Sequence, residues 1–151
     1  MFRGVNALNL DAKGRVAMPT RYRQRLSDTC DGQMVITVDN SDRCLLLYPL
    51  QEWEVVERKL QKLPSFNRQA RRLQRMLIGH ATEVEMDGTG RLLVPPPLRE
   101  FADLEKRVVL IGQSNKFELW NEELWTESRS DWMAAGDDLG DLPAEMETMS
   151  L

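Results

Sequence analysis

The sequence contains one internal repeat, and this repeat limits the possible folds more than any other feature. When the chain is shifted by 76 residues, segment 11–19 lies on segment 87–95, and Asp, Gly, Arg and Pro recur at the same spacing. The same shift places Arg23 on Arg99. Later apolar runs also correspond once a difference in loop length reduces the shift to 72 residues. The repeat therefore covers a whole small module, present in two copies.

Each copy is predicted to contain two short strands, a helix and two further strands. Apolar alternation and short apolar runs indicate the strands, and a proline ends the second strand where its fixed φ suits the start of a helix. In the first copy we expect strands at 5–10, 15–18, 34–38 and 45–48, with a helix after Pro19. In the second copy we expect the second, third and fourth strands at 91–94, 108–111 and 117–120, with a helix after Pro95.

Residues 51–80, between the copies, are predicted to form a helical linker. Apolar residues at helical spacing predict one amphipathic helix over 51–63, and a proline and a serine end it. A second helix is expected from about residue 67 to residue 78. Its expected apolar face contains Phe66, Ala70, Leu73 and Leu77, and another face carries Arg68, Arg71, Arg72 and Arg75.

Neither module is large enough to bury a sufficient core alone, because each has only about 50 residues. We therefore expect modules 5–50 and 81–125 to pair about a pseudo-two-fold axis, each covering the apolar face of the other. The predicted fold class is α+β: one intrachain β-barrel from two tandem ββαβ modules, with flanking amphipathic helices. An acidic tail, residues 126–151, is expected to be poorly ordered.

The net charge of −4 hides a separation of charge along the chain. Residues 117–151 hold ten acidic residues and one basic residue, so residues 1–116 carry a net charge of +5. Residues 58–78 hold seven basic residues and no acidic one. Blocks of like charge are usually solvated faces, but a local basic patch is also what phosphate binding requires. Charge alone does not choose between these readings.

Several classes of function find no support in the sequence. No apolar run approaches the roughly 20 residues that cross a bilayer, and the N-terminus lacks a signal peptide, so we expect a cytoplasmic protein without membrane contact. Cys30 and Cys44 show no metal-binding spacing and are expected to be reduced and structural. His80 has no ligand cluster near it, and no flanking signature supports a Cys30/His80 nucleophile pair. We predict no enzyme, no metal, no cofactor and no small-molecule substrate.

The repeated Asp-x-x-Gly segments are turn motifs. An aspartate accepts from backbone N–H groups two or three residues on, and a glycine tolerates positive φ, so Asp11, Gly14, Asp87 and Gly90 are assigned to turn structure. A single such motif would suggest only a hairpin. Two copies in a pseudo-symmetric barrel place two basic loops on one edge, as in two-fold DNA-binding proteins.

The arginine that follows each glycine is the strongest DNA-binding candidate. Arginine engages phosphate or guanine with two donors at once, which suits Arg15 and Arg91 to either role. Lys13 and Arg3 are expected to assist them. Thr89 stands where Lys13 would recur, so the second loop is predicted to bind phosphate more weakly.

The basic stripe at residues 68, 71, 72 and 75 has two interpretations. Its spacing suits phosphate contacts, but the chain also contains acidic regions that offer partners within the chain or between subunits. We favour the protein partner, because single-sign stripes more often meet an opposite one when both are present.

The pattern Asp11-x-Lys-Gly-Arg15-x-x-x-Pro19 and its repeat resemble the swapped-hairpin barrels of the AbrB-like family of bacterial DNA-binding proteins. Residues 1 to about 125 are similar to tandem-module regulators within it, through short strings that include Met1-Phe-Arg-Gly4, Leu45-Leu-Leu-Tyr-Pro49, Gly79-His-Ala81 and Asn115-Lys-Phe-Glu-Leu-Trp120.

The resemblance implies a sequence-specific regulator of transcription that binds double-stranded DNA. It implies a ring-like homo-oligomer, associated with the nucleoid, that binds repeated promoter sites. The implied target is the operon of cell-division and cell-wall genes that includes its own gene, with repression as the expected effect. The alternative is an antitoxin-like or scaffold barrel that binds proteins and contacts DNA only incidentally.

Overall fold

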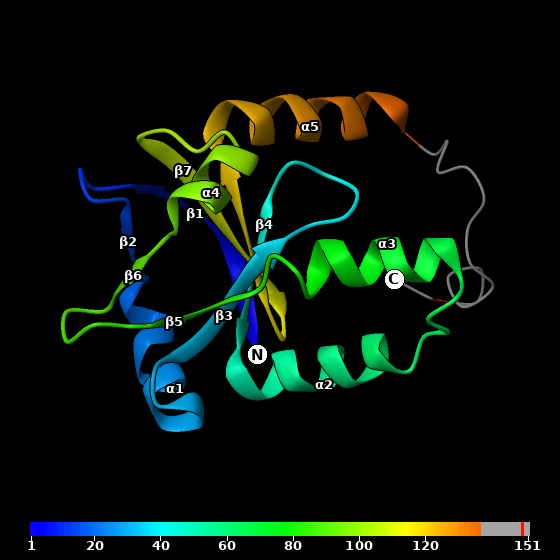
Figure 1. Cartoon of the computed structure of the whole chain (residues 1–151). Coiled ribbons are helices and arrows are strands. Elements are labelled where there is room, and N and C mark those ends of the chain that lie inside the picture. The colour runs from blue at the N-terminus through cyan, green and yellow to red at the C-terminus, as the bar shows by residue number, and fades with distance from the viewer. Residues whose placement is uncertain (137–148, 150–151) are drawn as a thin grey trace.

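The computed structural model describes residues 1–136 and 149, and it is α+β as the repeat predicts (Figure 1). Its strands are β1 (Phe2–Asn9), β2 (Arg15–Ala17), β3 (Gln33–Val38), β4 (Leu45–Pro49), β5 (Thr82–Glu85), β6 (Arg91–Leu93), β7 (Arg107–Ser114) and β8 (Phe117–Asn121). Its helices are α1 (Thr20–Cys30), α2 (Leu50–Gln61), α3 (Arg68–Leu77), α4 (Pro96–Phe101) and α5 (Glu122–Ala135).

The two modules are joined by an exchange of strands. Six strands form an open antiparallel sheet in the order β1-β7-β8-β4-β3-β5, and β2 pairs with β6 in a separate ribbon. The first strand of each module therefore pairs with the third strand of the other, as β1 with β7 and β5 with β3. Among the described residues, the hydrogen bonds between strands form no closed ladder. A sheet and a ribbon enclose the core together.

The register shows a pseudo-two-fold relation between the modules. Val16 lies opposite Leu92 in the ribbon, and these are residues that the 76-residue shift superposes. In the sheet Leu46 lies opposite Glu118, which the 72-residue shift superposes. An axis through both pairs relates the two halves, so their equivalent residues meet where the modules join.

The main core lies between one face of the sheet and the β2–β6 ribbon, with α1 and α4 beside it. Alternate residues of the strands point into it, as the period of two requires. Its largest fully buried members include Met18, Leu26, Leu47, Leu110 and Phe117. Full burial of each such side chain stabilises the fold by roughly 1.5–3 kcal/mol.

Helices cover the opposite face of the sheet, away from the ribbon (Figure 1). Helices α2 and α3 pack over β3 and β4, where Trp53 and Tyr48 are buried. Helix α5 packs over β7 and β8, where Trp120 is buried and Trp125 packs against it. The ribbon and the helical linker therefore lie on opposite sides of the sheet.

Local sequence explains where the helices begin. Pro19 and Pro95 are the N-cap residues of α1 and α4, directly before the helices that we expected after them. Side-chain oxygens of Asn67 and Asn121 accept from free backbone N–H groups at the starts of α3 and α5. These caps stop each helix from extending backwards into the preceding loop or strand.

Three expectations from the sequence are wrong. Strand β1 begins at Phe2 and not at residue 5, because Phe2 is a buried core residue. Phe66 precedes the N-cap of α3 and is 90% exposed, so it does not belong to the apolar face of that helix. Residues 126–135 are helical in α5 and not a poorly ordered tail. Residues 137–148 and 150–151 of the predicted tail lie outside the described residues.

Candidate nucleic-acid interface

The outer face of the β2–β6 ribbon carries two of the predicted DNA-binding residues. Val16 and Leu92 point into the core, so the residues on either side of them face outwards. The register places Arg15 opposite Leu93 and Arg91 opposite Ala17. The two arginines are therefore diagonal neighbours across the ribbon, at positions about 7–8 Å apart.

Asp11 closes the first turn and holds the arginine that follows it. Its Oδ1 accepts from the backbone N–H groups of Lys13 at 2.9 Å and Arg15 at 2.8 Å. Its Oδ2 accepts from the Arg15 Nε at 2.7 Å. These donors, with the Arg15 backbone first, hold the pKa of the Asp11 carboxyl below its ordinary value.

Asp87 closes the second turn in the same way. Its Oδ1 accepts from the backbone N–H groups of Thr89 and Arg91 and from the Thr89 hydroxyl, each at 2.9 Å. Its Oδ2 accepts from the Arg91 Nε at 3.1 Å. The Arg91 backbone donor is the main reason that the pKa of the Asp87 carboxyl lies far below its ordinary value. Both carboxylates therefore accept their hydrogen bonds from donors of their own turns.

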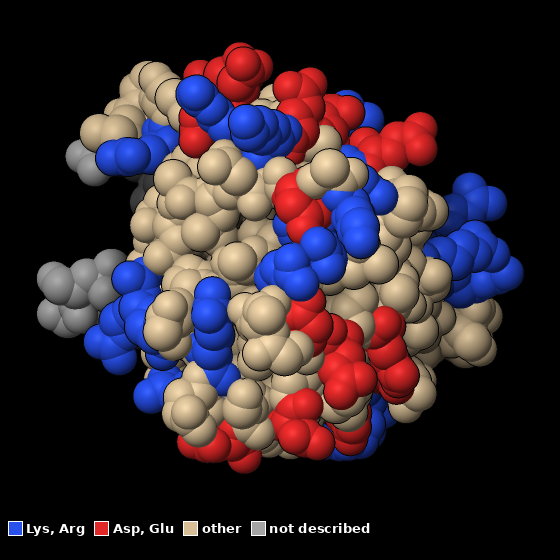
Figure 2. Space-filling model, turned by 90° about the vertical axis from the view of Figure 1, so that its left-hand side faces the viewer, with Lys and Arg blue, Asp and Glu red and all other residues tan. Residues whose placement is uncertain are grey.

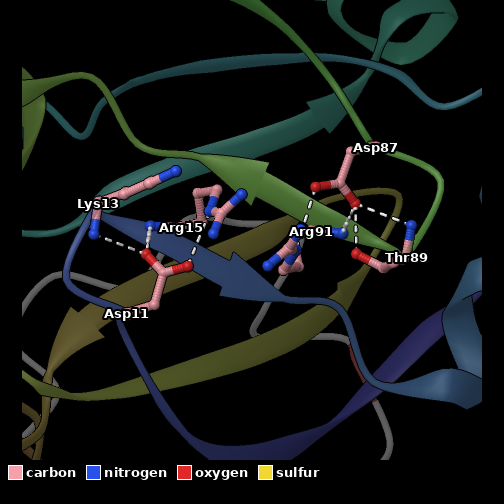
Figure 3. A network of polar contacts seen from close by, with 6 residues as sticks. All are labelled: Asp11, Lys13, Arg15, Asp87, Thr89 and Arg91. Carbon is pink, nitrogen blue, oxygen red and sulfur yellow. Dashed lines mark hydrogen bonds and ion pairs between the residues drawn. The ribbon is translucent and has the colours of Figure 1, made fainter.

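The paired aspartates orient the arginines and leave donors available. In each pair the ion contact runs through Nε alone, so the terminal nitrogens of the guanidinium make no ion pair among the described residues. Each of these groups retains four N–H donors, which match the oxygens of a phosphate or the edge of a guanine. Figure 3 shows both arginine side chains between the two turns, which lie at opposite ends of the ribbon.

The third positions of the two turns differ in chemistry. The Lys13 side chain is exposed, whereas the Thr89 hydroxyl at the corresponding position is bonded to Asp87. In Figure 2, which views the side of the molecule that carries the ribbon, basic side chains near the centre lie beside acidic ones. The first turn therefore adds a positive charge to this face that the second turn lacks.

The structure does not bring Arg3 together with these residues. Arg3 lies near the start of β1, and the first turn follows the far end of that strand, about 20 Å away at 3.3 Å per residue. There it lines a shallow hollow with Arg21 and Arg25 of α1. Arg21 is itself bonded to the Asn6 side chain. The N-terminal basic residues thus form two separate groups.

The α3 stripe, defined as Arg68, Arg71, Arg72 and Arg75, lies on the far side of the sheet. All four side chains are exposed. None has an acidic partner within 4 Å among residues 1–136 and 149. Because α3 packs on the face of the sheet opposite the ribbon, the stripe is not part of the ribbon surface.

Sequence reasoning gave no role to Arg23 and Arg99, yet both contact the turns. Arg99 of α4 lies against Gly14, and Arg23 of α1 lies against Gly90. Each arginine therefore reaches the turn of the other module. Their recurrence under the 76-residue shift was the available signal, but the crossed placement depends on the strand exchange.

Among the described residues, no group of three or more His, Cys, Asp or Glu side chains is placed to hold a metal ion. Cys30 and Cys44 are free and buried, and burial raises the pKa of the Cys44 thiol. The Cys30 thiol donates to the Leu26 carbonyl, and the His80 Nδ1 lies 2.8 Å from the Met76 carbonyl. In the part of the chain that is described, no helix has both the length and the apolar character that a membrane span needs.

The chain is a duplicated α+β module with exchanged strands and paired Asp–Arg turns, and this mixed architecture with an antiparallel six-strand sheet fits the AbrB-like class that the repeat resembles. A family model described as "MraZ protein, putative antitoxin-like" matches residues 1–76 and again residues 77–134. The chain therefore belongs to the MraZ family.

Relatives within this family align over the whole chain. A protein named transcriptional regulator MraZ from Halorhodospira halophila is 61% identical over 154 residues, with 100% of each chain covered. Proteins of the same name from Thioalkalivibrio sulfidiphilus and Legionella pneumophila are 59% and 55% identical, again with 100% of each chain covered. The alignment extends beyond residue 125, where the resemblance of short motifs ended.

Proposed function

We propose that this chain is a sequence-specific DNA-binding regulator of transcription and that the β2–β6 ribbon with its two turns is the reading surface. The observation that carries the proposal is the pair of outward-facing arginines, each oriented by an aspartate on an exposed ribbon. The major groove of B-DNA is about 12 Å wide and admits a two-stranded ribbon. The names of the relatives, all transcriptional regulators, support the same function.

The proposed contacts divide into base reading and phosphate binding. Arg15 and Arg91 have terminal donors that make no ion pair among the described residues, as guanine or phosphate requires, and the Lys13 ammonium suits a phosphate. Arg3 lies too far along β1 to join the same contact, so any role for it requires a second DNA segment or a neighbouring subunit. Asp11 and Asp87 act only through the arginines they hold.

Binding to the chain's own promoter tests this proposal. We expect the full chain to protect promoter repeats from nuclease cleavage, with an affinity that falls steeply with salt as several phosphates are neutralised. The double variant Arg15→Ala/Arg91→Ala should lose this protection. Arg58→Ala, which removes an exposed arginine of α2, is the matched control. Equal protection by the double variant and the wild type would refute the site assignment.

We also propose that the chain acts as a ring-like homo-oligomer, joined through opposite charges on two helices. Helix α5 exposes Glu123, Glu127 and Asp131 at four-residue spacing, which forms an acidic stripe on one face. This stripe and the α3 stripe have similar lengths, opposite charge and no ion pairs among the described residues. Repeated contacts along promoter repeats would then raise the affinity by avidity.

Charge reversal tests this assembly. Arg72→Glu/Arg75→Glu and Glu123→Lys/Glu127→Lys should each reduce the mass in solution at low salt. Mixing the two variants should restore part of it, because each supplies the partner that the other lacks. Lys106→Glu, at an exposed lysine with no ion pair among the described residues, is the control. Unchanged mass in both double variants would contradict this interface without affecting the DNA-binding proposal.

In the cell we propose a cytoplasmic, nucleoid-associated repressor of the operon of division and cell-wall genes that contains its own gene, with no enzymatic activity. A promoter reporter should rise when the gene is deleted and fall when it is overexpressed. The antitoxin-like term in the family description favours a second candidate, a barrel that binds a protein partner. Co-purification of one protein at equal stoichiometry, with no promoter footprint, would select that candidate.

A further inference from the structure

Each glycine of the two turns lies in close contact with an arginine of the opposite module. A Cβ added to Gly14 would lie 2.5 Å from the Arg99 Cζ, and one added to Gly90 would lie 2.4 Å from the Arg23 Nε. Such separations are shorter than real Cβ contacts, so a side chain at either glycine would displace the arginine. The guanidinium of each helix arginine therefore packs directly on the backbone of the other module's turn.

Backbone hydrogen bonds connect the same segments. The Val94 N–H donates to the Gly14 carbonyl at 2.9 Å, and the Met18 N–H donates to the Gly90 carbonyl at 2.8 Å. Both turn glycines have positive φ, at 82° for Gly14 and 80° for Gly90, so their carbonyls are directed by a backbone that only glycine adopts easily. Each turn is thus held from two sides by the module that did not supply it.

The two arginines are anchored differently. The Arg23 Nε donates to the Met18 carbonyl at 2.7 Å. The Arg99 Nε is buried and has no acceptor among the described residues. Both side chains are only half-exposed. A half-buried guanidinium packed against a turn is suited to fixing that turn in place.

We propose that Arg99 and Arg23 are crossed positioning residues for DNA binding. Arg99 of the second module orients the Asp11–Arg15 turn, and Arg23 of the first module orients the Asp87–Arg91 turn. The inference rests on the proposed DNA-binding function and goes beyond it, because it assigns each reading turn to a support in the opposite module. A planar guanidinium packs flat on a glycine, whereas a lysine ammonium does not, so lysine should not replace either residue.

The salt dependence of DNA binding separates positioning from a direct contact. A residue that only neutralises one phosphate changes the slope of log affinity against log salt by about 0.9, and lysine preserves it. If Arg99 positions the turn, Arg99→Ala and Arg99→Lys should both weaken binding by roughly tenfold, the scale of one lost arginine contact. Both variants should also lower the slope of log affinity against log salt by more than the value of about 0.9 that one lost phosphate contact gives. Full rescue by Arg99→Lys would overturn the proposal for this residue.

A crossed double-mutant cycle gives the sharper test. Arg99→Ala should be strongly non-additive with Arg15→Ala and additive with Arg91→Ala, because it acts through the first turn. Arg23→Ala should show the reverse pattern. Arg58→Ala should be additive with all of them. Coupling within modules, or no coupling, would refute the crossed arrangement.

Amide chemical shifts of the free protein test the crossed contacts without DNA, and they also show whether each variant is folded. Arg99→Lys should shift the amides of residues 11–15 and leave those of residues 87–91 in place, while Arg23→Lys should do the opposite. If these shifts appear but the wild type binds no promoter DNA, the proposed function fails and the crossed support stands. If the wild type binds DNA and the shifts are absent or uncrossed, the positioning role fails.

Discussion

The Asp11 and Asp87 turns have the same backbone hydrogen bonds but differ in charge. In each turn the aspartate accepts from the backbone N–H and from the Nε of the arginine four residues on, which is Arg15 for Asp11 and Arg91 for Asp87. At the third position the first turn exposes Lys13, and the second bonds Thr89 back to its aspartate. Duplication has therefore preserved the scaffold while the surface charge has diverged. The comparison separates the residues that build a turn from those that set its surface charge.

The difference extends to the supports behind the turns. The second turn has one more hydrogen bond, from the Thr89 hydroxyl, and its support Arg23 is anchored to a carbonyl. The first turn carries the extra cation, and its support Arg99 has a buried donor without an acceptor among the described residues. The first turn is thus the more basic of the two, and the second is the more firmly held. Four measurements test this contrast between the turns.

The largest effect is expected from removing the arginines singly. Arg15→Ala should weaken promoter binding by roughly 5- to 150-fold, the range for one bidentate base contact. Arg91→Ala should weaken promoter binding less than Arg15→Ala does, because the turn of Arg91 contains no lysine. Fluorescence anisotropy with promoter DNA at fixed salt measures both. A larger loss for Arg91→Ala would reverse the ranking of the turns.

Glycine substitutions test the scaffold that the turns share. Gly14→Ala and Gly90→Ala each force an alanine to positive φ, which costs about 1–2 kcal/mol of folding free energy, and each also displaces an arginine. Gly90→Ala should destabilise more, because Arg23 must leave the Met18 carbonyl. Urea unfolding gives the free energies. Gly88→Ala is the matched control, since an added Cβ meets open space there.

Exchanging the third residues tests the charge difference alone. Lys13→Thr should lower the salt slope of DNA binding by about 0.9, and Thr89→Lys should raise it by a similar amount. The double exchange should return the slope to near the wild-type value with the turns reversed in rank. Titrations at several salt concentrations measure this. If Lys13→Thr leaves the salt slope unchanged, this lysine contacts no phosphate.

The smallest effect concerns acid stability. The pKa of both turn aspartates is held below the ordinary value of 3.8, so their ionised forms stabilise the fold. That contribution is present above the unfolded value and is lost as pH falls through the lower folded values. The melting temperature should therefore drop below about pH 4. Asp11→Asn/Asp87→Asn should melt lower at neutral pH and show a flatter acid decline; parallel curves would contradict the assignment.

Much of the local structure followed from particular residues. The Asp11 and Asp87 turns, the helix after Pro19 and the helices of the linker lie close to where the patterns placed them, because caps, turns and apolar spacing act over a few residues. The prediction for Phe66 was wrong because helical spacing continued past Asn67, whose side chain caps the helix and leaves Phe66 outside it. The start of β1 was misplaced because the glycine at position 4 weakened the strand pattern.

The placement of Arg3, Arg23 and Arg99 was not readable from the sequence. Spacing along the chain grouped Arg3 with Lys13, but the strand between them is extended and separates them by most of its length. Nothing local indicates that Arg23 serves the turn of the other module, because that contact exists only after β1 and β5 exchange partners. Contacts of this kind depend on pairing between segments that are distant in the chain.

Residue types and short-range spacing are enough to show that the chain holds two related modules, that each has an aspartate–glycine turn followed by an arginine, and that the first turn is the more basic. The diagonal placement of the two arginines on one ribbon, and the contact of each turn with an arginine of the opposite module, arise only in the folded structure. The physical reason is that strand exchange satisfies the backbone hydrogen bonds of each module with the other, and this pairing fixes every long-range contact at the site.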